Sequence, residues 1–206
     1  MTRVFFLFLC CTDVWDDGIS DSFVTVSAGG QMAKIHSRYQ VGRNVSKYMA
    51  ICSKYQIGDA GVDTKWTIQF NHTHLIAIGL VARSSENDLE RVVRGDFNAS
   101  VVRWVSFCPH PYADLLFLPG PAAGNDLKLE NVEAKTVMLS GDRPTPGEPV
   151  SLEFQFSPTT NIVSLISLNG SRFDAPFLVF HGPGIATLTP YFAISQPLNE
   201  ETVHIK

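Results

Sequence analysis

The stretch "VSLEFQFSPTTNIVSLISLNGS", residues 150–171, decides the fold. In its first part apolar residues alternate with polar ones: Leu152, Phe154 and Phe156 against Glu153 and Gln155. Successive side chains of a strand point to opposite faces, so this alternation predicts a strand with one buried face and one wet face. A second apolar run ends in Asn169-Gly170, the strongest short signal for a two-residue type I′ hairpin turn, which needs positive φ at both residues. The stretch therefore predicts antiparallel sheet.

The triplet Asn169-Gly170-Ser171 also fits the acceptor rule for N-glycosylation, as do sites at Asn44, Asn71 and Asn98. Short polar turns combine Asn with Ser and Thr in any compartment, so the hairpin is the preferred interpretation. The opening "MTRVFFLFLCC" (1–11) has a basic residue before an apolar run, which is compatible with a short secretory signal or an N-terminal strand. We expect a cytoplasmic protein, and a secreted protein is the alternative.

Runs rich in Val, Ile, Phe and Thr recur along the chain between clusters of Gly, Pro, Asn and Asp. This spacing is typical of a sandwich of antiparallel strands. The expected strands are Phe23–Ser27, Ala33–His36, Tyr48–Ser53, Lys65–Phe70, Leu75–Ala82, Val101–Phe107, Ala134–Ser140, Val150–Ser157, Ile162–Leu168, Pro176–Val179, Thr189–Ile194 and Thr202–Ile205. One short helix is expected in "SSENDLERVVRGD" (84–96). We expect an N-terminal apolar segment (1–13) and one β-sandwich domain (14–206).

The 206 residues are 45% hydrophobic and 17% charged, which is the composition of an ordinary globular protein with a sizeable core. The formal net charge is -4 and there is no long basic run, so nucleic acid is not an expected partner. No transmembrane segment is expected, because no apolar run is long enough to span a bilayer. The four cysteines contain no CxxC pair, so a disulfide scaffold is not expected. The sequence leaves the oligomeric state open.

The longer stretch "GEPVSLEFQFSPTTNIVSLISLNGSRFDAPF" (147–177) resembles the C-terminal half of SPRY (B30.2-like) domains, with a long strand, a turn and a strand ending in Asn-Gly. Upstream, "DVWDDGISDSFVTVSAGGQMAKI" (13–35) is similar to the family's opening Trp-Asp segment, and "DTKWTIQFNHTHLIAIGLVARS" (63–84) to its central hairpin. Near the end, "TPYFAIS" (189–195) and "ETVHI" (201–205) are similar to its last strands. The order of these motifs carries the resemblance.

The resemblance covers roughly residues 14–206 and implies a bent antiparallel β-sandwich, a jelly roll related to concanavalin, without enzymatic activity. The chain departs from the family at Trp66-Thr67, where Trp-Glu is frequent, and at Gly147-Glu148, where Gly-Asp is frequent. SPRY domains bind a short peptide or an exposed partner segment through loops at one end. They often act as the adaptor or targeting part of a regulator such as a ubiquitin ligase.

Side chains that could carry catalysis do not form a known motif. Possible metal ligands are Cys108, His110 and Asp114, and the pair His72 and His74, but their spacing is unspecific. A loop stiffened by two prolines at "CPHPY" (108–112) and a polar turn at "NHTH" (71–74) explain these residues without a metal. The sequence contains neither a Gly-x-Ser-x-Gly elbow nor a P-loop. We expect no catalytic residue, no metal and no cofactor.

Loops on a rigid sandwich remain as the place for function. Aromatic and arginine side chains are enriched at interface hot spots. The expected binding residues are therefore Tyr39, Arg83, Arg103, Tyr112 and Arg172, and the expected partner is a protein or peptide. One alternative is a secreted lectin, which stacks an exposed aromatic ring on a sugar and is weakened if Trp66 and Trp104 are both buried. The other is a glycosidase, which needs two carboxylates facing each other in a groove.

Overall fold

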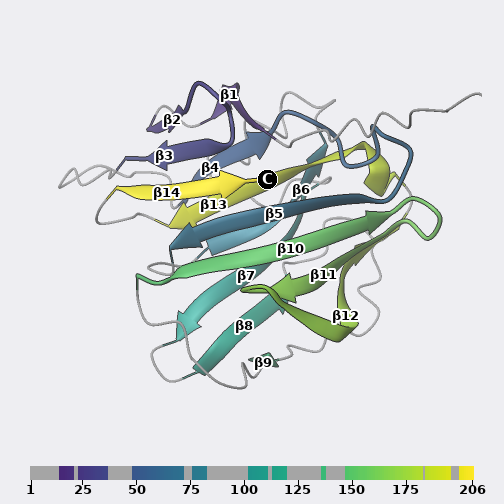
Figure 1. Ribbon diagram of the computed structural model, residues 1–206. Coiled ribbons are helices and arrows are strands. Elements are labelled where there is room, and N and C mark those ends of the chain that lie inside the picture. The colour runs from purple at the N-terminus through teal and green to yellow at the C-terminus, as the bar shows by residue number, and fades with distance from the viewer. Residues whose placement is uncertain are drawn as a thin grey trace, which may run out of the picture.

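The computed structural model describes residues 14–20, 23–36, 48–71, 76–82, 102–110, 113–119, 136–137, 147–182, 184–195 and 200–206. Apart from one three-residue 3₁₀ helix, η1 (Ile185–Thr187), the regular elements in these ranges are strands. They form two seven-stranded antiparallel sheets. Sheet B, which contains residues 149–157, lies in front of sheet A, which contains residues 76–82 (Figure 1). The predicted all-β antiparallel sandwich is confirmed. The predicted helix at 84–96 lies outside the described residues.

Sheet B has one face in the core and one face turned outward. Its spatial order is β12 (Ser171–His181), β11 (Ile162–Leu168), β10 (Pro149–Ser157), β5 (Thr64–Asn71), β14 (Glu201–Ile205), β3 (Met32–Ile35) and β2 (Val24–Val26). In β10, Leu152, Phe154 and Phe156 are buried, whereas Glu153 and Gln155 are half-exposed. The predicted alternation of this strand is thus confirmed, and β5 and β14 follow the same pattern.

Sheet A is buried on both faces along its central strands. Its spatial order is β1 (Trp15–Ser20), β4 (Tyr48–Ser53), β13 (Leu188–Ser195), β6 (Ile76–Ala82), β7 (Val102–His110), β8 (Ala113–Pro119) and β9 (Thr136–Val137). Every residue of β6, "IAIGLVA", is buried, and so are residues 49–53 of β4 and 188–194 of β13. An unbroken apolar run is the pattern of a strand covered on both faces. Among the strands whose burial is described, the outer face of sheet B is an open sheet surface.

Aromatic rings from both sheets fill the core between them. On sheet B, Trp66 and Phe154 are register partners whose rings stack with centroids 5.4 Å apart. Between the sheets, Phe70 of β5 meets Phe192 of β13 at 5.5 Å. Burying each large apolar side chain contributes about 1.5–3 kcal/mol to folding. Trp15 of β1 is also buried and donates its Nε1 hydrogen to the carbonyl of Val203, 3.3 Å away, which ties the first strand to the last.

The β11–β12 turn has the predicted two-residue form. Leu168 and Ser171 are register partners, so Asn169 and Gly170 alone form the turn. Their φ angles are 48° and 80°, which are the positive values of a type I′ turn. The Asn169 backbone N–H donates to the Ser151 carbonyl, and the Asn169 Oδ1 accepts the Ser151 N–H, each at 2.8 Å. The turn is thus fastened to the start of β10.

Two strands, β1 and β8, lie where the sequence predicted none. The loop predicted at residues 108–112 was wrong in part. β7 continues through Pro109 to His110, and its register with β8 shifts between Cys108 and His110. A strand tolerates proline at such a bulge because its missing N–H is not needed there. β1 was missed because Asp16, Asp17 and Gly18 interrupt any apolar alternation in this edge strand, whose register is also irregular.

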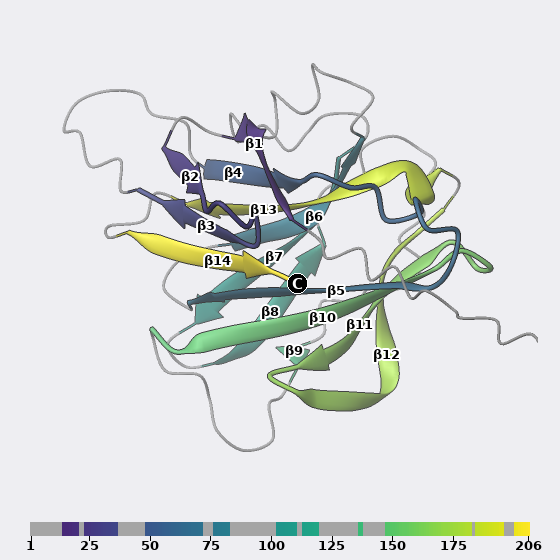
Figure 2. The ribbon, with the colours of Figure 1, turned by 45° about the horizontal axis from the view of Figure 1, so that its top comes forward.

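The strand registers place the connections at two opposite ends of the sandwich. At one end lie Asn71 and Pro149, which pair with each other, and Glu201, which pairs with Ile35. We call this the groove end; it is at the left of Figure 1, and Figure 2 shows the same grouping from above. The opposite end, the η1 end, contains η1 and the pair of Leu188 with Ala82.

Candidate functional site

A shallow groove of about 420 Å³ crosses the outer face of sheet B at the groove end. Three adjacent strands form it: β14, β5 and β10. The lining residues are Gln69, Phe70, Asn71, Pro149, Val150, Ser151, Thr202 and His204. Its volume lies within the range of about 300–1,000 Å³ that is usual for ligand pockets. The groove is the candidate site that the described residues offer.

Alternation along the strands determines which side chains face the groove. Gln69 and Asn71 of β5 point outward, because Phe70 between them is 3% exposed and belongs to the core. On the adjacent strands, Ser151 and His204 are also partly exposed, and His204 is the register partner of Gln69. The Gln69 Nε2 donates to the Ser151 Oγ at 3.3 Å. The groove wall is therefore made of amide, hydroxyl and imidazole groups.

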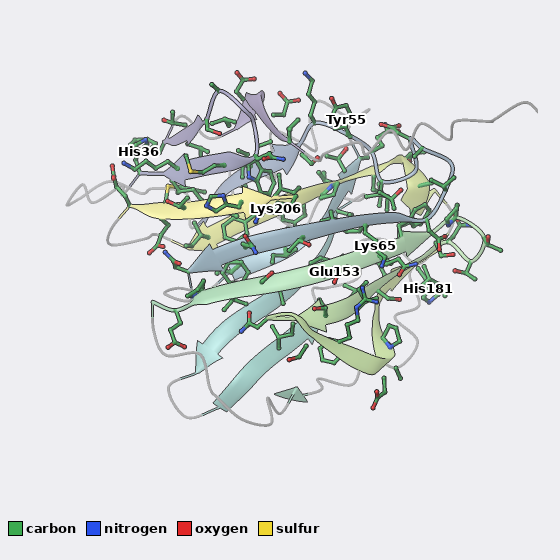
Figure 3. All side chains as sticks on the ribbon, in the orientation of Figure 1. His36, Tyr55, Lys65, Glu153, His181 and Lys206 are labelled. Atoms are coloured by element: carbon green, nitrogen blue, oxygen red, sulfur yellow. The ribbon has the colours of Figure 1, made fainter. Side chains whose placement is uncertain are left out.

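A charged cluster borders the groove on the side of β3. Glu200, just before β14, accepts from the Lys34 Nζ and lies 2.9 Å from the His36 Nδ1. The His36 Nε2 is 2.9 Å from the Thr25 Oγ1 of β2. The Lys34 hydrogen bond, followed by that of His36, lowers the pKa of the Glu200 carboxyl below its ordinary value. His36 is seen at the outer edge of the sheet in Figure 3.

The five binding residues expected from sequence do not share one place. Arg172 is exposed on β12, one residue beyond Ser171, near the groove end. Arg103 lies on β7 opposite Leu80, toward the η1 end. Tyr39, Arg83 and Tyr112 lie outside the described residues.

The described residues that flank these three positions in the chain lie at both ends of the sandwich. Residues 37–47, which include Tyr39, connect His36 to Tyr48, and both of these flanking residues are at the groove end. His110 and Ala113, which flank Tyr112 in the sequence, pair with each other at the same end. Arg83 directly follows Ala82 at the η1 end. The described flanks of Tyr39 and Tyr112 therefore share the groove end with Arg172, whereas Ala82, which precedes Arg83, and Arg103 lie toward the η1 end.

The η1 end carries exposed apolar side chains rather than a groove among the described residues. Tyr55 is 38% exposed and Val62 60% exposed, in the connection between β4 and β5 (Figure 3 labels Tyr55). Gly58 in this connection donates its N–H to the Ala186 carbonyl at 2.8 Å. A Cβ atom at Gly58 would lie 2.5 Å from the Ala186 Cβ, so this close approach requires glycine. The connection is thus fixed against η1.

The sequence did not reveal the groove as a site. Its residues come from segments around positions 69, 150 and 203, and only the strand pairing brings them together. The available signal is in "TKWTIQF" (64–70), where the polar Thr67 and Gln69 alternate with apolar residues, a pattern that predicts an outward Gln69. That signal identifies a wet face of a strand, but it does not identify the neighbouring strands.

The two alternative functions meet structural obstacles in the described residues. Trp15 and Trp66 are 2% and 3% exposed, so neither ring can stack on a sugar; the Trp104 side chain lies outside the described part. The groove lining contains no aspartate or glutamate, so this groove lacks the facing carboxylates of a glycosidase. The described residues also contain no group of three or more His, Cys, Asp or Glu placed for a metal ion. No helix in the described ranges has the length and apolarity to span a bilayer.

No family model matches the sequence, and no curated protein matches it either. Solved structures do match. The PSpry domain of TRIM65 is similar with a TM-score of 0.55 and 13% identity, over 95% of this chain and 92% of that one. Stonustoxin has the same TM-score at 12% identity, over 95% of this chain and 29% of that one. The SPRY domain of human HERC1 has a TM-score of 0.53 at 13% identity, over 93% of this chain and 96% of that one. The β-sandwich of this chain is similar in fold to those of SPRY domains.

Proposed function

We propose that the chain is a non-enzymatic protein-interaction module that binds a peptide or an exposed partner segment at the groove end. In this proposal it works in the cytoplasm and brings its partner to a separate effector, such as a ubiquitin ligase, or to a signalling protein. The likeness in fold to SPRY domains supports the general role. The resemblance in motifs supports recognition by loops at one end.

One observation carries the choice of end. The described flanks of Tyr39 and Tyr112, the exposed Arg172 and the polar groove all lie at the groove end. Aromatic and arginine anchors provide most of the binding energy at interfaces, and polar groups around them provide orientation. A connection surface on a rigid sandwich can present both kinds of group without a large loss of conformational entropy on binding.

The first step of the test is to express the full tagged chain in a eukaryotic cell. We expect it in the cytosol, with a gel mobility that glycosidase treatment does not change. A secreted, glycosylated product would contradict the cytoplasmic role and would favour the lectin.

The second step screens the purified chain against random peptides displayed on phage. One variant carries Tyr39→Ala, Tyr112→Ala and Arg172→Ala, and the matched variant carries Arg83→Ala and Arg103→Ala. We expect the first to weaken binding of the selected peptides by at least about tenfold and the second by less than about twofold. The proposal fails if no peptide is selected, or if only the second variant loses binding.

A further inference from the structure

Several polar side chains on and beside the outer face of sheet B pair with one another. Lys65 and Glu153 face each other from β5 and β10 at 3.9 Å (Figure 3). The Gln155 Nε2 donates to the Asp63 Oδ2 at 3.0 Å. At the β2–β3 side, the cluster around Glu200 joins four side chains. These polar groups thus have partners within the protein.

The groove collects polar side chains from three neighbouring strands. Within the described part of the chain, the side chains of Asn71, Thr202 and His204 form no hydrogen bond to another residue. Gln69 and Ser151 share one long hydrogen bond of 3.3 Å, which leaves most of the amide's capacity unused. Five polar side chains from three strands thus converge in one hollow. Such convergence is what a recognition site needs.

The backbone beneath the groove holds these groups in place. Phe70 and Val150 are register partners, and their buried side chains anchor β5 and β10 in the core. Val203 of β14 pairs with Phe70 from the other side. Three hydrogen-bonded strands therefore fix the spacing of the groove side chains before any ligand arrives. A preformed site loses little entropy when it binds.

The groove chemistry indicates a neutral ligand. Its lining contains no lysine, arginine, aspartate or glutamate, and the adjoining Lys34 is neutralised by Glu200. Amide and hydroxyl groups both donate and accept, which matches the alternating N–H and C=O groups of an extended polypeptide. A sugar would need an aromatic platform, but the only aromatic lining residue, Phe70, is 3% exposed.

We propose that the groove formed by Gln69, Asn71, Ser151, Thr202 and His204 binds an extended, uncharged segment of a partner polypeptide across strands β14, β5 and β10. This inference rests on the proposed function and specifies the chemical character of the partner segment. Affinity is insensitive to salt, because binding at this site forms no ion pair that ions could screen. Recognition that depended on Arg172 alone would weaken as salt rises.

The test uses the full chain and a display library of capped peptides that lack Asp, Glu, Lys, Arg and His. The selected peptides are measured by isothermal titration calorimetry at low and high salt. Ser151→Lys places a long charged side chain in the groove. Ser164→Lys is its matched control on the adjacent strand, because Ser164 is half-exposed and pairs with Gln155 away from the groove. A cooperative thermal unfolding transition is required of both variants, as the check that each is folded.

We expect Ser151→Lys to weaken binding by at least about tenfold and Ser164→Lys by less than about twofold, with the same affinity at both salt concentrations. Thr202→Lys, on the other wall, should repeat the loss. If uncharged peptides bind Ser151→Lys with the same affinity as the wild-type chain, the groove is not their binding site. The proposed function survives this result if the Tyr39/Tyr112/Arg172 variant no longer binds these peptides. If the uncharged library yields no binder while the random peptide library yields charged binders, the inference is overturned and the proposed function is kept. If glycans bind in the groove and no peptide binds, both are overturned.

Discussion

At the scale of single residues, two asparagines adopt the left-handed backbone conformation for different reasons. Asn169 has φ 48° in the β11–β12 turn, and Asn161 has φ 53° in the β10–β11 turn. Only Asn169 also uses its side chain, whose Oδ1 accepts the Ser151 N–H at 2.8 Å. Asparagine tolerates positive φ better than other residues with a Cβ. Asn169 therefore provides both the positive φ of its turn and a side-chain hydrogen bond, whereas Asn161 provides only the positive φ.

Replacing Asn169 should separate these two roles. Asn169→Gly keeps the turn but loses the hydrogen bond to Ser151, which should cost about 1 kcal/mol of unfolding free energy. Asn169→Ala loses the hydrogen bond and adds left-handed strain, for a total of about 2–3 kcal/mol. Asn161→Gly is the control and should change stability by less than about 0.5 kcal/mol. Urea unfolding measures all three, and equal effects of Asn169→Gly and Asn169→Ala would contradict the role of φ.

Local turn chemistry explains why this turn could be predicted from sequence. Asn-Gly specifies a type I′ turn through the φ angles of two neighbouring residues, without help from the rest of the fold. The binding role of Arg172, two residues further on, is a different kind of statement. It depends on which connections lie beside β12, and therefore stays a prediction tested by the variants above.

At the scale of elements, strands with an uninterrupted apolar or alternating run were predicted well and interrupted strands were not. The bounds expected for β4 and β11 agree with the structure at both ends. β12 was expected only at Pro176–Val179 but spans Ser171–His181. Its register with β11 shifts between Leu165 and Ser167, so residues 173–176 bulge away from the ladder. Bulges and charges protect an edge strand from pairing with other chains, and they also hide the strand in the sequence.

The Glu200 cluster couples strands β2, β3 and β14 in a way that depends on pH. Lys34 and His36 lower the pKa of Glu200, so the native state favours the ionised carboxylate more than the unfolded chain does. The stabilisation is therefore present above the ordinary glutamate pKa and is lost as pH falls through the lowered one. Glu200→Gln should reduce the midpoint of thermal unfolding at neutral pH, and the difference from wild type should vanish well below about pH 4.

Glu153→Gln provides the matched control for this element-scale prediction. It removes one carboxylate from the same face of sheet B. There the Glu153 Oε1 forms a single ion pair with the Lys65 Nζ, 3.9 Å away. Exposed single pairs contribute little to stability, so its effect at neutral pH should be smaller than that of Glu200→Gln. A difference between wild type and Glu200→Gln that grows as the pH becomes more acidic would have the wrong sign for this mechanism.

At the scale of the whole molecule, alternation and the order of motifs were sufficient for the sandwich but not for the groove. One face of β5 and β10 was predicted to be buried, which determines a two-layer β fold. The groove requires β5 to lie between β10 and β14, and its one internal hydrogen bond joins residues 82 positions apart. Pairing at such separation depends on the packing of the complete core, which no local pattern contains.

The contact between Phe70 and Phe192 joins the two sheets in the core, and we expect the sheets to unfold together. Phe192 is 1% exposed in sheet A, and its ring meets that of Phe70 from sheet B. Phe192→Ala should leave a cavity between the sheets and cost about 3–5 kcal/mol, whereas Phe192→Leu should cost less than about 1.5 kcal/mol. Tryptophan fluorescence and far-ultraviolet circular dichroism should shift together, because buried Trp15 and Trp66 report on sheets A and B respectively. Two separate transitions in Phe192→Ala would mean that each sheet has its own stability, and the groove on sheet B would then not depend on sheet A for its rigidity.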